Sequence, residues 1–85
     1  MRNRTFTSEA WESYLYWRTQ DRKTLRRINE LIQAAQRDTF TGVGKPEPLK
    51  HGLGGCWSRR IDETNRLVYM VNGEELIFIS CRFHY

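Results

Sequence analysis

One glutamate in this sequence is placed where it could accept a proton. Glu47 stands between Pro46 and Pro48, and each proline fixes its own φ and disfavours the helical conformation in the preceding residue. We therefore expect Glu47 in an extended segment. Lys45 and Lys50 lie close by in the sequence, and nearby cations favour the charged carboxylate. A surface glutamate in a proline-rich turn is the alternative interpretation of this stretch.

The end of the chain offers an imidazole and a phenol. Residues Leu76–Tyr85 read LIFISCRFHY, which predicts one strand that carries His84 and Tyr85 at its end. Because strand residues alternate between faces, we expect His84 to share a face with Arg82. Phe83 would point the other way and anchor the strand in the core. The alternative for His84 is an ordinary exposed residue near the terminus.

Arginines on the two preceding strand segments complete a set of groups that could cut RNA. Without a metal, this reaction needs a base for the 2′-hydroxyl, an acid for the leaving 5′-oxygen and cations for the phosphate. The sequence offers Glu47 as the base, His84 as the acid, and Arg66 with Arg59 as the cations. Arg59 and Arg60 must face opposite ways, so only one of them can join a given site. Any of these arginines could instead be a surface charge.

Other kinds of chemistry find little support in the sequence. The segment GVGKPEP lacks the GxxxxGK[ST] pattern of a phosphate-binding loop. Cys56 and Cys81 lack the paired spacing of a zinc site, and we expect both to be buried thiols. We therefore expect neither a metal nor a cofactor.

Length and charge limit the function classes. A chain of 85 residues predicts one domain, residues 1–85. The net charge is +4, and most of the 14 cationic residues are arginine, which suits phosphate or nucleic acid. No apolar run approaches the ~18 residues of a membrane span. The N-terminus lacks the apolar core of a signal peptide. We expect a cytoplasmic protein that does not contact a membrane.

Hydrophobic periodicity and turn residues divide the chain into two helices and a meander of strands. Thr7 or Ser8 and then Asp21 are suited to cap the helices. The expected elements are a strand at 2–7, helices at 8–19 and 22–38, and strands at 56–62, 66–71 and 76–85. Helices followed by a meander indicate an α+β fold, in which two N-terminal helices cover one face of a small, mostly antiparallel twisted sheet. We expect the N-terminal strand to join that sheet and the other face to carry the function.

Two further stretches bear on packing and binding. The aromatic residues Trp11, Tyr14 and Trp17 form one stripe, which favours a place in the core over stacking on bases. The connection 39–55 is unusually long for so small a domain and holds five of the six glycines. We expect it to be functional, with apolar residues that include Phe40 and Val43 holding it in place.

The second helix carries a basic face that could dock on structured RNA. Its cations clearly outnumber Glu30 and Asp38. Most charge runs on helices are merely solvated, so that interpretation stays open. The residues of the predicted RNA-binding face are Arg22, Lys23, Arg26 and Arg27.

Six segments together resemble the YoeB toxins of the RelE superfamily, the RNA-cleaving half of bacterial type II toxin–antitoxin pairs. They are WESYLYW at 11–17, INELI at 28–32, GKPEPLKH at 44–51, WSRRI at 57–61, NRLVY at 65–69 and CRFHY at 81–85. They run in order along nearly the whole chain. Cys56 departs from the pattern, where a larger apolar residue is usual, and the N-terminus is more basic than usual.

The resemblance implies a RelE-like microbial RNase fold and an enzyme that cuts mRNA in the ribosomal A site. Glu47 then matches the catalytic glutamate and Arg66 the arginine that stabilises the transition state. His84 matches the acid, and Tyr85 the terminal tyrosine. Lys50 and Arg59 would contact phosphate on the same analogy.

The resemblance also implies partners. These are the bacterial ribosome with its mRNA, and an antitoxin of the YefM/Phd type whose partly disordered tail disables the site. A homodimer is compatible with it, and operator DNA would be reached only through the antitoxin. Two non-enzymatic alternatives remain, a ribosome- or RNA-binding repressor of translation and a co-repressor that acts with the antitoxin. The complete set of glutamate, arginine and histidine favours the nuclease.

Overall fold

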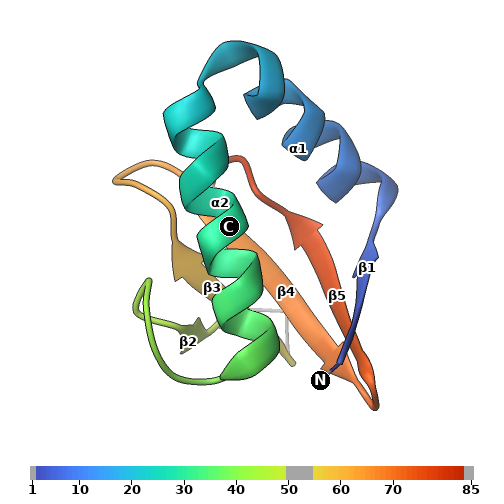
Figure 1. The fold of residues 1–85 in the computed structure, drawn as a ribbon. Coiled ribbons are helices and arrows are strands. Elements are labelled where there is room, and N and C mark those ends of the chain that lie inside the picture. The colour runs from blue at the N-terminus through green and yellow to red at the C-terminus, as the bar shows by residue number, and fades with distance from the viewer. Residues whose placement is uncertain (1, 50–54, 84–85) are drawn as a thin grey trace.

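A five-stranded sheet with two helices on one face forms the molecule (Figure 1). The computed structural model describes residues 2–49 and 55–83. Its strands are β1 (Asn3–Phe6), β2 (Glu47–Pro48), β3 (Cys56–Arg60), β4 (Arg66–Asn72) and β5 (Glu75–Ser80), and its helices are α1 (Ser8–Gln20) and α2 (Arg22–Arg37). The strand order is β1-β5-β4-β3-β2. β1 runs parallel to β5, and the other neighbours are antiparallel. The predicted α+β fold is confirmed, including the N-terminal strand in the sheet.

Both helices begin at the residues that the sequence predicts. The Thr7 hydroxyl accepts a hydrogen bond from the Ala10 amide at 3.1 Å, and Asp21 accepts from the amides of Lys23 and Thr24. Such caps satisfy amides that the first helical turn leaves without partners. The bonds from Thr24 are the main reason that the pKa of Asp21 is lowered.

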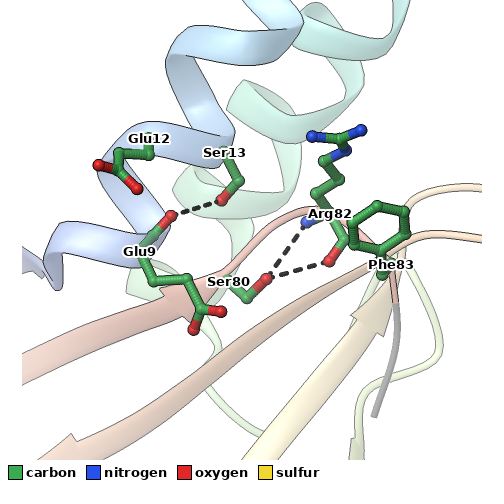
Figure 2. A pocket seen from close by; sticks show the side chains of 6 residues that line it. All are labelled: Glu9, Glu12, Ser13, Ser80, Arg82 and Phe83. Carbon is green, nitrogen blue, oxygen red and sulfur yellow. Dashed lines mark hydrogen bonds between the residues drawn. The ribbon is translucent and has the colours of Figure 1, made fainter.

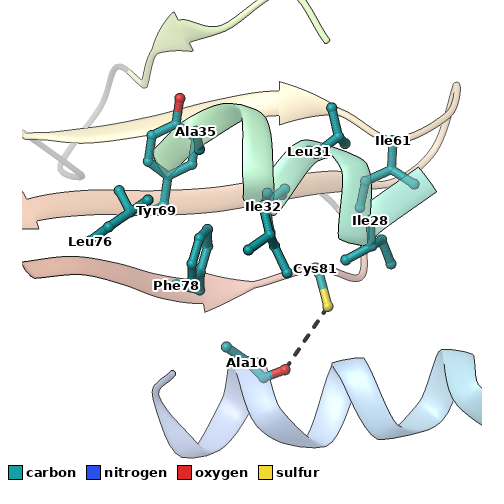
Figure 3. Close-up of a cluster of buried hydrophobic side chains, with 11 residues drawn as sticks. Ala10, Ile28, Leu31, Ile32, Ala35, Ile61, Tyr69, Leu76, Phe78 and Cys81 are labelled. Carbon is teal, nitrogen blue, oxygen red and sulfur yellow. Dashed lines mark hydrogen bonds between the residues drawn. The ribbon is translucent and has the colours of Figure 1, made fainter. Parts of the chain in front are cut away.

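The core lies between the helices and the sheet face that they cover (Figure 3). α2 contributes a stripe at helical spacing, and β4 and β5 contribute Tyr69, Leu76 and Phe78. The buried residues of α2 are Ile28, Leu31, Ile32, Ala34 and Ala35. Trp11 departs from the expected stripe, because its side chain is 49% exposed and stacks on Tyr14 at the surface.

The last strand is shorter than expected. β5 ends at Ser80, and Cys81 turns toward α1, where its carbonyl accepts a 2.8 Å hydrogen bond from the Trp17 indole. The expectation that Phe83 anchors this strand in the core is wrong. Phe83 has a φ of +64° and its side chain is 59% exposed. Contacts with α1, distant in sequence, end the strand where the apolar run alone suggested that it continues.

The other strand ends differ by one or two residues from the expectation. β3 stops at Arg60, and β4 continues to Asn72 before a tight turn at Gly73, whose φ is +61°. No helix in residues 2–49 or 55–83 is long and apolar enough to cross a membrane.

Candidate active site on the far face of the sheet

Glu47 lies extended on β2, as its two prolines predict, and meets an arginine across the sheet. Its Oε1 atom lies 3.2 Å from Nη1 of Arg66, at the start of β4. The same Arg66 nitrogen donates to the Ser58 hydroxyl at 3.2 Å. Ser58 pairs directly with Glu47 in the β2–β3 ladder. The expected base and the expected phosphate-binding arginine are therefore in contact, although they lie 19 positions apart in the sequence.

These three residues project from the face of the sheet that the helices do not cover, here called the far face. Alternate residues of a strand point to opposite faces. Trp57 packs against the helix-side core, and so do Leu67 and Tyr69 of β4. Their neighbours Ser58 and Arg66 must therefore point to the far face. The Glu47 side chain is 57% exposed and the Arg66 side chain 24%, so a substrate could reach both.

Arg60 is the second arginine of this face. It is exposed and pairs directly with Arg66 across the β3–β4 ladder. Like charges directly opposite each other repel, so an anion between them would be stabilised. The sequence-based prediction places Arg59, rather than Arg60, at the phosphate. Trp57 is the residue that distinguishes them. An apolar residue is expected to face the core, so Arg59, two residues later, faces the core as well, and Arg60 faces the opposite side of the sheet.

Arg59 does not reach the far face, so the prediction that it contacts phosphate is wrong. Its side chain is 0% exposed and lies on the helix side of the sheet. The guanidinium donates to the Tyr69 hydroxyl and to the carbonyls of Asp38, Thr41 and Val43. Because the guanidinium makes these hydrogen bonds inside the protein, it is not available to bind a phosphate.

The described end of the chain is tied to the start of β4. The Phe83 amide donates to Oδ1 of Asn65 at 2.6 Å, and the Arg66 amide donates to the Phe83 carbonyl at 2.8 Å. His84 and Tyr85, which follow Phe83, lie outside the described residues, as does Lys50. The backbone of Phe83 is thus held against Arg66 by a hydrogen bond.

A hollow of about 190 Å³ lies beside this end of the chain, between α1 and the end of β5 (Figure 2). Arg82 turns its guanidinium over the Tyr16 ring, 3.5 Å from the ring centroid, and it lies 4.5 Å from that of Phe83. The lining residues are Glu9, Glu12, Ser13, Ser80, Arg82 and Phe83. The cation–π contacts give Arg82 a structural role at the chain end.

The predicted basic face lies at the start of α2. Arg22, Lys23 and Arg26 are exposed, whereas Arg27 is half-buried and donates to the Arg60 carbonyl at 3.2 Å. A hollow of about 320 Å³ adjoins Arg22 and Arg26 and is also lined by Arg18. The structure thus leaves three of the four predicted residues available to an anionic partner.

Cys56 lies two residues before Ser58 on β3, and Cys81 directly follows β5. Both are free and buried, as expected, and burial raises the pKa of each thiol. Within residues 2–49 and 55–83 no group of three or more His, Cys, Asp or Glu side chains could hold a metal ion.

Comparison with known proteins identifies the family. A family model described as the YoeB-like toxin of bacterial type II toxin–antitoxin systems matches residues 6–85. The toxin YoeB of Streptomyces coelicolor is 56% identical over 81 residues, which cover 95% of this chain and 96% of that protein. The chain belongs to the YoeB-like toxin family. It is therefore the toxin of a type II toxin–antitoxin system.

Solved structures agree with the fold of the toxin. A YoeB dimer from Staphylococcus aureus has a TM-score of 0.91 at 42% identity and covers 99% of this chain and 98% of its own. YoeB in a heterotetrameric YoeB–YefM toxin–antitoxin complex from the same organism has a TM-score of 0.88 at 42% identity, covering 100% and 99%. The predicted RelE-like fold is confirmed.

Proposed function

We propose that the toxin is a metal-independent endoribonuclease that cuts mRNA in the ribosomal A site and thereby inhibits translation. The observation that carries this proposal is the contact between Glu47 and Arg66 on an accessible face of the sheet. When a carboxylate and a guanidinium lie 3.2 Å apart, both can act on one phosphate group. The carboxylate can remove the proton of the attacking hydroxyl, and the guanidinium can stabilise the charge on the phosphate that is attacked.

The reaction divides between named residues. Glu47 takes the proton of a 2′-hydroxyl, and the 2′-oxygen attacks the adjacent phosphorus. Arg66 stabilises the negative charge that builds up on the phosphate oxygens. His84 gives a proton to the 5′-oxygen as its bond to phosphorus breaks, which leaves a 2′,3′-cyclic phosphate and a 5′-hydroxyl. Tyr85 would orient the phosphate.

Further cations hold the RNA around the reacting phosphate. Arg60, rather than Arg59, would contact the phosphate, because it is exposed beside Arg66 on the far face. Lys50 is the other proposed phosphate contact. At the start of α2, the exposed residues Arg22, Lys23 and Arg26 would bind ribosomal RNA, whereas Arg27 would act mainly by holding β3.

The partners follow from the same proposal. The toxin would act in the cytoplasm on ribosome-bound mRNA, and an antitoxin of the YefM type would neutralise it. The Staphylococcus aureus relatives form a YoeB–YefM complex and a YoeB dimer, which supports such an antitoxin and a homodimer here. Binding to operator DNA would occur through the antitoxin.

Replacing Glu47 with glutamine tests the proposal. Glu47→Gln keeps the shape of the side chain but removes its basicity, and loss of a general base lowers rates by ~10²–10⁴-fold. We expect that loss in single-turnover cleavage, measured by mapping mRNA ends on translating ribosomes. Glu74→Gln, at an exposed glutamate in the β4–β5 turn, is the matched control. If both variants cut at the wild-type rate, Glu47 is not the base.

A further inference from the structure

Arg59 is a buried cation that the proposed reaction does not use. Its side chain is fully buried, and within residues 2–49 and 55–83 no carboxylate lies within ion-pair distance of it. Burying a charge without compensation is costly. Compensation comes from oxygens of neutral groups: the Tyr69 hydroxyl at 3.1 Å, the carbonyls of Val43 and Thr41 at 2.8 Å each, and the carbonyl of Asp38.

The three carbonyls belong to one loop, which begins where α2 ends. Asp38 is the C-cap of α2, and the C-terminal end of a helix carries a partial negative charge that favours a cation. Tyr69 extends the same network, since its hydroxyl donates to the Thr39 carbonyl at 2.7 Å while it accepts from Arg59. Burial raises the pKa of Tyr69, so its hydroxyl keeps the proton that it donates. One buried network thus holds the loop at residues 38, 39, 41 and 43.

Apolar contacts alone hold this loop weakly. Phe40 and Val43, which we expected to fix it, are 46% and 45% exposed. Phe40 does contact the Trp57 ring, with centroids 4.8 Å apart. The polar network is therefore the main buried attachment of residues 38–43 in the described structure.

The loop leads directly into Glu47. The Gly44 carbonyl accepts a 2.7 Å hydrogen bond from the Arg60 amide, which attaches the end of the loop to β3. Gly44 has a φ of +89°, and a Cβ there would lie 2.7 Å from the Leu31 side chain and 3.1 Å from Cβ of Arg59. The stem of Arg59 therefore packs against Gly44, three residues before Glu47. A shift of this loop would carry Glu47 away from Arg66.

We propose that Arg59 and Tyr69 are positioning residues, whose buried hydrogen bonds fix the 38–44 loop and thereby hold the Glu47 carboxylate against Arg66. This inference rests on the proposed role of Glu47 as the base. It gives Arg59 a function in cleavage that requires no contact with RNA.

Removing one hydroxyl tests the inference. Tyr69→Phe keeps the ring in the core but removes the bonds to Thr39 and Arg59. We expect single-turnover cleavage at saturating toxin to fall ~10- to 100-fold, because small displacements of a catalytic group have effects of this order. The affinity for the ribosome should not change. Amide hydrogen exchange in residues 38–44 should become faster.

A second tyrosine gives a matched control. Tyr14→Phe also removes one phenolic hydrogen bond, to Asn29 at 2.9 Å, but it lies between the helices. It should leave both cleavage and exchange in the loop unchanged. Arg59→Lys keeps the charge but not the fork of donors, so it should reproduce the slow cleavage of Tyr69→Phe.

Combination with Glu47→Gln separates positioning from a general loss of structure. If Tyr69 acts through Glu47, Tyr69→Phe should slow cleavage little further in the Glu47→Gln background. An equal factor in both backgrounds would overturn the inference, and so would wild-type cleavage by Tyr69→Phe and Arg59→Lys. If the single variant Glu47→Gln cleaves at the wild-type rate, both the assignment of Glu47 as the base and the positioning role are overturned. Slow Glu47→Gln beside normal Tyr69→Phe would overturn only the positioning role.

Discussion

At the scale of single residues, the contact between Glu47 and Arg66 matters for chemistry more than for stability. More than half of the Glu47 side chain is exposed, and exposed ion pairs contribute about 0–1 kcal/mol to the free energy of unfolding. The same pair becomes important when a phosphate arrives, because the guanidinium can then bind the phosphate oxygens through its planar fork of donors.

Replacing Arg66 should therefore separate activity from stability. We expect Arg66→Ala to lower the single-turnover cleavage rate by ~10²–10³-fold, the usual loss when one stabilising donor of a transition state is removed. The free energy of unfolding should fall by about 1 kcal/mol or less. Thermal melting and cleavage of ribosome-bound mRNA measure the two effects, with the exposed Arg4→Ala as control. Normal cleavage by Arg66→Ala would remove Arg66 from the site.

The conformation of a single residue can be predicted from the sequence where its immediate neighbours determine it. The prolines around Glu47 determine its extended conformation, and the strand that begins at Arg66 follows from its residue pattern. The alternation that starts from Trp57 gives the face of Arg59, but its partners could not be predicted in this way, because its four acceptors lie 10 to 21 residues away and belong mostly to the backbone of a loop. A backbone carbonyl looks the same in every sequence.

At the scale of elements, the β3–β4 turn holds the start of β4 against the end of the chain. Asp62 accepts hydrogen bonds from the amides of Thr64 and Asn65 and from the Asn65 side chain. Asn65 in turn accepts the Phe83 amide. One turn therefore connects Arg66 with the segment that precedes His84.

The sequence predicts too long a β5, because Cys81 continues the apolar run of this strand. The contacts with α1 that end the strand involve residues 64 to 68 positions earlier in the sequence.

The stability contributed by this turn should depend on pH. Burial raises the pKa of Asp62, but the hydrogen bonds from Asn65 and Thr64 outweigh this effect and leave it below the ordinary value of 3.8. A lowered pKa means that the unfolded chain binds the proton more tightly. The contribution is therefore present above the unfolded-state pKa and is lost as the pH falls through the folded-state pKa.

We expect thermal melting between pH 5 and pH 2, a range of about three units around that pKa, to show a smaller acid loss of stability in Asp62→Asn than in the wild type. Glu63→Gln, in the same turn, is the control and should keep the wild-type dependence. Parallel curves for the wild type and Asp62→Asn would show that the turn carboxylate is not linked to folding.

At the scale of the whole molecule, the sheet brings distant segments to one face while the helices present a separate cationic surface. Glu47 and Arg66 lie on β2 and β4, on either side of β3, and Arg66 is hydrogen-bonded to Phe83, so three distant parts of the chain meet here. The basic surface at the start of α2 lies on the helix layer, and Arg27 links it to β3 through the Arg60 carbonyl. Binding to the ribosome and cleavage of the mRNA should therefore be separable by mutation.

Charge removal at the two ends of α2 tests this separation. Arg22→Gln with Arg26→Gln removes two exposed cations at the start of the helix, whereas Arg4→Gln with Arg37→Gln removes two near its other end. Each phosphate contact contributes affinity that declines with salt, with a slope of about 0.7–0.9 per contact in a log–log plot. We expect the first pair to weaken ribosome binding and flatten its salt dependence by about 1–2 in slope.

The second pair should behave like the wild type in ribosome affinity. Once bound at saturating concentration, both variants should cut mRNA at the wild-type rate, because neither pair lies next to Glu47 or Arg66. Affinity measured at several salt concentrations and single-turnover cleavage supply the two readouts. Equal losses of affinity in both variants would mean that net charge, rather than the surface at the start of α2, attracts the toxin to the ribosome. A lower cleavage rate at saturation in the first variant would mean that this surface also orients the mRNA in the site.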